Sequence, residues 1–119
     1  MSARAEPLAD RPGDPQRGMA LAVDAEKGNC IACHVLPIPA IPAGSFGDLG
    51  PSLEGVGSRL TVEELRQRIV DPKIMSPDTI MPAYHATEGL HRVQPRYAGK
   101  PVLDAREVED VVAYLETLK

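Results

Sequence analysis

Two stretches of the chain repeat apolar residues at the three- to four-residue spacing of an α-helix. In the middle of the chain, Thr61 and Glu64 form a capping-box sequence ahead of such a repeat, which predicts a helix over 62–70. Near the end, Asp104 is a suitable N-cap for a predicted helix over 105–118. The apolar face of this last helix comprises Val108, Val111, Val112, Leu115 and Leu118.

A further helix is predicted over 15–27 from its end signals. Asp14 is a suitable N-cap, and Pro15 suits the first helical position. Gly28 suits the left-handed conformation that often ends a helix. Cys30 would then follow shortly after the end of this helix.

The segments between these helices are rich in proline and glycine, and none of them alternates convincingly as a strand. The sequence therefore predicts an all-α fold, with the N- and C-terminal helices packed together and loops wrapped around something between them. Residues 1–12 are expected to be a flexible segment, and residues 13–119 a single domain. Residues 1–12 also lack the basic start and apolar stretch of a signal peptide, so an exported protein would already have lost its signal.

Cys30-Ile31-Ala32-Cys33-His34 is typical of a c-type haem attachment site. Two cysteines three residues apart can form thioethers with the two vinyl groups of one porphyrin. The adjacent His34 then lies under the iron as its proximal ligand. The motif predicts one covalent haem c.

Three other interpretations of these cysteines fit less well. A redox Cys-x-x-Cys pair needs no adjacent histidine, and the strand-then-helix context of such pairs is missing. A zinc site needs a fourth ligand, for which only His85, His91 or a carboxylate remain. A structural disulfide leaves the position of His34 unexplained.

The sixth iron ligand is predicted to be Met81. Pro82 follows it and disfavours helical geometry at residue 81, so the methionine is expected in an extended loop that can present its sulfur to iron. The alternative is that Met81 binds no iron and fills a gap in the core. The other candidate ligands are Met19, Met75, His85 and His91, and a further alternative is an open coordination position.

The composition agrees with a haem protein. The chain has three tyrosines, one phenylalanine and no tryptophan, so a bound porphyrin would supply apolar area that aromatic residues usually provide.

The net charge is −4 with no dense Lys/Arg cluster, which argues against nucleic-acid binding. No apolar run reaches the roughly 18 residues of a membrane span. Among the arginines, Arg59 is the preferred partner for a haem propionate.

The ordered motifs together resemble a known family. They are the haem motif, then Gly50-Pro51-Ser52-Leu53, then ELR at 64–66 and IVDP at 69–72, then PDTIMPAY at 77–84 and EVEDVVAYL at 107–115. This set is similar to the SoxX family, the monohaem subunits of the SoxAX cytochromes of bacterial thiosulfate oxidation. The likeness covers roughly residues 15 to 118 and implies a class I cytochrome c fold.

The resemblance also implies which residues hold the haem. It carries the two covalent attachments over to Cys30 and Cys33, and the two iron ligands to His34 and Met81. In class I cytochromes c, the proline carbonyl of a Gly-Pro-x-Leu segment accepts the second imidazole proton of the proximal histidine. Pro51 would take this role for His34.

The same resemblance implies a periplasmic heterodimer with a SoxA-like cytochrome subunit. That partner carries the catalytic haem of an L-cysteine S-thiosulfotransferase, which couples thiosulfate oxidatively to a cysteine of the SoxYZ carrier. The present chain would accept the electrons and pass them to a soluble cytochrome c. Two alternatives remain: a freestanding electron shuttle, and a haem sensor or peroxidase-like protein with an open iron site.

Overall fold

The structure is a computed structural model that describes residues 7–9, 12–74, 76, 78–79, 81, 84–85 and 102–119. Within these residues the chain forms helices and turns without any strand, which confirms the predicted all-α class. The α-helices are α1 (Pro15–Val23), α2 (Val56–Arg59), α3 (Val62–Val70) and α4 (Ala105–Glu116). Single 3-10 turns form η2 (Cys30–Ala32), η3 (Ala43–Ser45) and η4 (Pro72–Ile74). Every helix in the described part of the chain is too short or too polar to span a bilayer.

Helix α3 has the predicted bounds and the predicted capping box. The Glu64 backbone N–H donates to Thr61 Oγ1 at 3.1 Å, and the Thr61 N–H donates to Glu64 Oε1 at 3.0 Å. These two bonds satisfy N–H groups that the first turn of a helix leaves without a partner. The helix ends at Val70, and its C-cap Asp71 precedes Pro72.

Helix α1 is shorter than predicted and ends at Val23 rather than Lys27. Asp24 leaves the helical conformation, and its carboxylate accepts the Glu26 N–H at 2.9 Å, a local turn that competes with helix continuation. Gly28 is also not the left-handed residue. That conformation falls on Asn29, at φ 48°, directly before η2.

Helix α4 begins with the predicted Asp104 cap, and Glu107 completes a capping box. It ends at Glu116, two residues before the predicted end. Thr117 turns its hydroxyl back to the Tyr114 carbonyl at 2.6 Å, and the Leu118 carbonyl accepts the Gly57 N–H at 2.7 Å. The last residues therefore hold α2 rather than extend α4.

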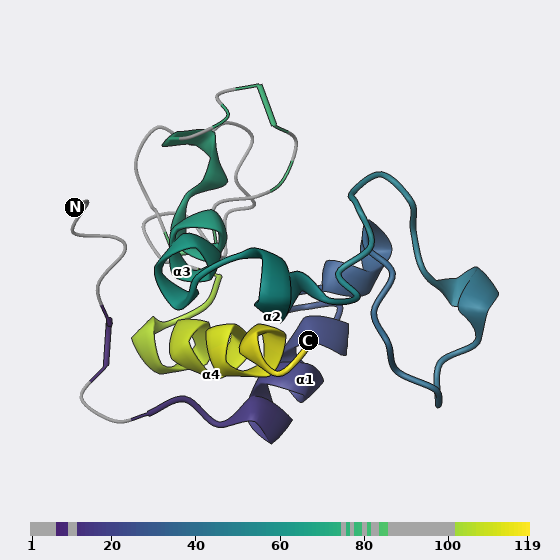
Figure 1. The fold of residues 1–119 in the computed structure, drawn as a ribbon, viewed down its shortest axis with the longest axis horizontal. Coiled ribbons are helices and arrows are strands. Elements are labelled where there is room, and N and C mark those ends of the chain that lie inside the picture. Colours follow the sequence, from purple (N-terminus) through teal and green to yellow (C-terminus); the bar gives the residue numbers. More distant parts are fainter. Residues whose placement is uncertain are drawn as a thin grey trace.

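The terminal helices cross in close contact, as predicted (Figure 1). At the crossing, Gly18 of α1 lies directly on α4. A Cβ atom at this position would collide with the Asp110 carbonyl oxygen and lie 2.8 Å from Tyr114 Cβ. Glycine is therefore required for the two backbones to approach this closely.

A buried ion pair connects α3 to α4. Arg66 Nε lies 2.8 Å from Glu109 Oε2, and Arg66 Nη2 lies 2.9 Å from Glu109 Oε1, so the contact is bidentate. Both residues are buried, at 5% and 8% exposure. Glu109 Oε2 also accepts the Leu8 N–H at 3.3 Å, which brings the N-terminal segment onto the same carboxylate. No pattern in the sequence indicates that these two charges are buried.

The predicted flexible segment at 1–12 lies partly outside the described residues, which include only 7–9 and 12 of it. The domain boundary at residue 13 stays a prediction.

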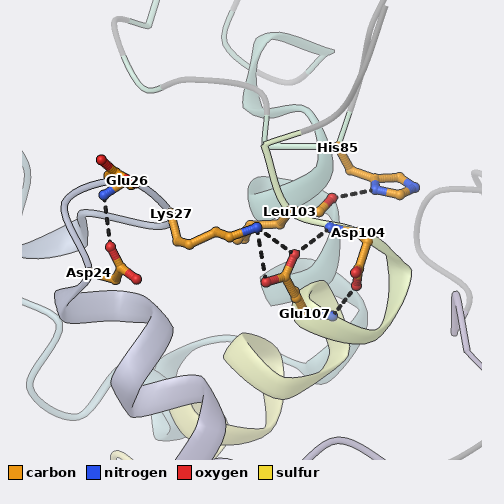
Figure 2. A network of polar contacts seen from close by, with 7 residues as sticks. All are labelled: Asp24, Glu26, Lys27, His85, Leu103, Asp104 and Glu107. Carbon is orange, nitrogen blue, oxygen red and sulfur yellow. Dashed lines mark hydrogen bonds and ion pairs between the residues drawn. The ribbon is translucent and has the colours of Figure 1, made fainter. Parts of the chain in front are cut away.

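A second ion pair ties the turn after α1 to the start of α4 (Figure 2). Lys27 Nζ lies 3.2 Å from both carboxylate oxygens of Glu107, and the Glu107 carboxylate also accepts the Asp104 N–H. The lysine is more than one-third exposed, so this pair contributes little to stability. It marks where the segment leading into Cys30 contacts the C-terminal helix.

We expect Glu109→Ala to lower the free energy of unfolding by about 3–5 kcal/mol, because it leaves the Arg66 guanidinium buried without its carboxylate. Urea unfolding of the haem-loaded protein, followed by far-UV circular dichroism, measures this change. Glu116→Ala, at an exposed position on the same helix, is the control and should change stability by less than about 0.5 kcal/mol. Equal effects of the two substitutions would contradict the structural role of the pair.

Candidate functional site

A cavity of about 640 Å³ opens between the N-terminal half of the chain, α3 and the segment around residue 81. Its volume falls in the range typical of cofactor pockets, about 300–1,000 Å³. Its walls are mainly apolar and include Leu53, Val56, Leu60, Leu65, Ile69 and Leu115. The structure brings all the site residues predicted from the sequence to this cavity: Cys30, Cys33, His34, Pro51, Arg59 and Met81.

His34 is held at the cavity by one hydrogen bond of its backbone and one of its ring. The His34 N–H donates to the Cys30 carbonyl at 2.9 Å, which closes the turn that begins with η2. The ring Nδ1 lies 2.6 Å from the Pro51 carbonyl oxygen. Because a carbonyl can only accept, Nδ1 carries the proton, and Nε2 keeps its lone pair for a metal.

Gly50 makes room for this imidazole. A Cβ atom on Gly50 would lie 2.6 Å from His34 Nδ1 and 2.7 Å from Nε2, and it would be closer still to Cε1. The ring therefore lies flat against the backbone of the Gly-Pro turn. The Gly50 N–H in turn donates to the Cys33 carbonyl at 2.7 Å, which fixes the turn to the haem motif.

Both cysteines line the cavity, and neither forms a disulfide. Burial raises the pKa of the Cys30 thiol to about 11, so this thiol is protonated at neutral pH. A redox-active Cys-x-x-Cys pair needs a lowered thiol pKa, so the geometry disfavours that alternative. Within the described residues, no three His, Cys, Asp or Glu side chains cluster as a metal site.

Met81 lines the cavity and is half-buried, and its N–H donates to Thr79 Oγ1 at 3.2 Å. The other ligand candidates are placed differently where the structure describes them. Met19 is 40% exposed on α1, away from the cavity lining. His85 directs Nδ1 to the Leu103 carbonyl at 2.9 Å (Figure 2) and does not line the cavity. Met75 and His91 lie outside the described residues.

Arg59 stands at the cavity with its guanidinium bonded to the turn that carries Pro51. It donates to the Glu54 carbonyl at 2.5 Å and to the Ser52 carbonyl at 3.1 Å. A second arginine, Arg68, also lines the cavity and is half-buried. Sequence reasoning did not place Arg68 there, although its helical spacing from Leu65 and Ile69 puts all three on one face of α3.

Tyr84 is the main site residue that sequence reasoning missed. It lines the cavity, is buried, and donates its hydroxyl to the Gly28 carbonyl at 2.6 Å. Burial raises the pKa of the Tyr84 hydroxyl, with smaller contributions from Cys30 and Cys33, so the hydroxyl remains a donor. Its N–H also donates to the Ile69 carbonyl at 3.0 Å. Tyr84 therefore joins the Met81 segment to α3 and to the chain just before Cys30.

Comparison with known proteins agrees with this geometry. A protein-family model described as cytochrome c matches residues 15–119. The chain belongs to the cytochrome c family. Among solved structures, it is similar to a chain of the crystal structure of SoxXA from P. pantotrophus, with 34% sequence identity and a TM-score of 0.84. This match covers 100% of the present chain and 93% of that chain, and it confirms the resemblance to SoxX drawn from the sequence. No curated protein matches the chain.

The cofactor of this cytochrome c family member is a covalent haem c. The residues at the cavity fit that group. Two unpaired cysteines stand beside an imidazole whose Nε2 is free, a thioether lies in the same cavity, and the remaining walls are mostly apolar. Two arginines at the cavity supply positive charge suited to the propionates of a haem.

We expect Gly50→Ala to displace the His34 ring, because the added methyl group would overlap it. The substitution should lower the free energy of unfolding of the haem-loaded protein by about 1–3 kcal/mol and alter its visible absorbance. Urea unfolding and the absorbance spectrum measure the two effects. Gly44→Ala is the control, since a Cβ there meets no atom within 4 Å, and it should leave both measurements unchanged. A wild-type spectrum for Gly50→Ala would refute the close packing of the ring.

We expect Tyr84→Phe to cost about 1–2 kcal/mol of stability, because the Gly28 carbonyl loses its donor. Tyr114→Phe is the matched control. Tyr114 is equally buried, and its hydroxyl has no hydrogen-bond partner among the described residues, so its removal should be neutral within about 0.5 kcal/mol or stabilising. Urea unfolding midpoints measure both variants. Equal losses in the two variants would show that the Tyr84 hydroxyl bond contributes nothing specific.

Proposed function

We propose that this chain is the electron-transfer subunit of a SoxXA-type complex, with its haem attached at Cys30 and Cys33 and ligated by His34 and Met81. One observation carries the proposal: a single cavity holds both thiols, an imidazole with a free Nε2, and a thioether. The haem iron would supply one-electron chemistry by alternating between its ferric and ferrous states.

The residues around the cavity favour electron transfer over ligand chemistry. Pro51 fixes the tautomer and orientation of the His34 ring, so that this ligand keeps its position in both oxidation states. The Met81 thioether, a soft ligand, would stabilise the reduced state and raise the potential. If His34 and Met81 both bind the iron, no coordination position stays open, which argues against a sensor or peroxidase.

The partners follow from the similarity to SoxXA. We propose that a SoxA-like cytochrome subunit binds this chain, that the complex acts on thiosulfate and the SoxYZ carrier in the periplasm, and that a soluble cytochrome c accepts the electrons. The catalytic centre would lie on the partner subunit. Arg59 and Arg68 are proposed to face the haem propionates from the cavity wall.

Met81→Ala tests this assignment on the haem-loaded protein. Acid–organic extraction of the denatured wild type should first leave the haem on the polypeptide. The variant should then show a lower reduction potential, by more than about 59 mV, which is tenfold in the one-electron equilibrium. It should also bind added imidazole, because an axial position has opened.

Met19→Ala is the control for methionine loss in general, because Met19 is exposed on α1. This variant should keep the wild-type reduction potential and, like the wild type, bind no added imidazole. Extractable haem would disprove covalent attachment. A wild-type potential and spectrum for Met81→Ala would show that another residue binds the iron.

A further inference from the structure

The segment that follows the haem motif is nearly free of charge. From Gly28 to Gly47 the chain contains no Asp, Glu, Lys or Arg, although charged residues make up 25% of the protein. The apolar loop, residues 36–49, contains most of this segment and a single charged residue, the exposed Asp48 near its C-terminal end. Depletion of charge over a continuous stretch is typical of the centre of a protein–protein interface rather than of a solvated loop.

The apolar loop projects away from the helices, as the blue to teal segment at the right of Figure 1. Its prolines Pro37, Pro39 and Pro42 are exposed, as is Ala40. A Cβ atom added at Gly44 would meet no atom within 4 Å, so the backbone there lies in open space. The tip therefore presents apolar surface that the described part of the chain leaves exposed.

The base of the apolar loop is fixed to the haem motif. The Gly47 N–H donates to the Ile31 carbonyl at 2.8 Å, the Gly50 N–H to the Cys33 carbonyl at 2.7 Å, and the Leu53 N–H to the Val35 carbonyl at 2.9 Å. Three prolines further restrict the loop backbone. A restricted loop loses little entropy when it binds, which favours its use as a docking element.

The apolar loop also reaches the rim of the cavity. Leu49, at its C-terminal end, is 72% exposed and lines the cavity at the same time. A protein that covers the loop would therefore lie next to the haem pocket. Electron transfer requires this proximity between a partner and the cofactor.

We propose that the apolar loop is the docking surface for the partner cytochrome subunit, and that it binds an apolar, charge-poor surface of that subunit. The inference rests on the proposed function. A transient electron acceptor typically binds through complementary charges, and its binding weakens as salt is added. A loop whose one charged residue is Asp48, next to its C-terminal end, suits a lasting subunit contact instead, and the solved chain that matches this one over its full length comes from a SoxXA structure.

The test compares the same substitutions at two exposed alanines. Ala40→Glu and Ala40→Lys introduce either charge in the apolar loop, and Ala20→Glu and Ala20→Lys introduce the same charges on α1. Each haem-loaded variant is titrated with the purified SoxA-like partner subunit by isothermal titration calorimetry. We expect both Ala40 variants to raise the dissociation constant about tenfold or more, because either charge would be buried unpaired. The Ala20 variants should stay within about twofold of wild type, and all four should keep the wild-type visible spectrum.

The outcomes separate this inference from the function on which it rests. If the wild type binds the partner and the Ala40 variants bind equally well, the docking surface is wrong while the function stands. If one charge weakens binding and the other strengthens it, the contact is electrostatic and the inference is also wrong. A wild-type chain that dimerises in solution, with Ala40→Glu monomeric, would assign the loop to self-association instead. If the wild-type haem protein binds no such partner, the proposed function itself fails.

Discussion

The hydrogen bond between the His34 ring and the Pro51 carbonyl joins the haem motif to the turn that follows the apolar loop. It does more than orient a side chain, because it assigns the proton to Nδ1 and so leaves Nε2 available to iron. The bond forms only because Gly50 lacks a side chain where the ring lies. The same turn bonds to the Cys33 carbonyl, so the proposed iron ligand His34, the proposed attachment site and the base of the apolar loop form one unit.

The helices hold this unit in a fixed position relative to α3, which forms a wall of the cavity. Helix α1 crosses α4 at Gly18, and α4 holds α3 through the buried Glu109–Arg66 pair. Helix α3 contributes the apolar wall and accepts the Tyr84 N–H on the Ile69 carbonyl. Because the Tyr84 hydroxyl then reaches back to Gly28, the segments that carry Met81 and the haem motif are connected directly.

Local signals predicted much of this protein, and tertiary contacts explain the rest. The capping boxes at Thr61 and Asp104 are short-range patterns, so the starts of α3 and α4 follow from the sequence. The early end of α1 depends on a turn at Asp24 that competes closely with the helix, and such boundaries are hard to predict. The buried contacts that the sequence did not predict have longer-range causes. Tyr84 is positioned by partners far from it in the chain, and the burial of Arg66 depends on Glu109.

The distribution of charge around the cavity bears on how electrons leave and enter. Arg59 and Arg68 place positive charge at the cavity, where it can balance acidic groups of the cofactor. The apolar loop, whose one charged residue is Asp48, places mostly apolar surface beside the same cavity and is fixed to the haem motif by backbone hydrogen bonds. A subunit bound to this loop would exclude water from the cavity rim at Leu49. Lower polarity around a haem is one of the means by which a protein tunes its potential. Partner binding and electron affinity would then be linked through the same short segment.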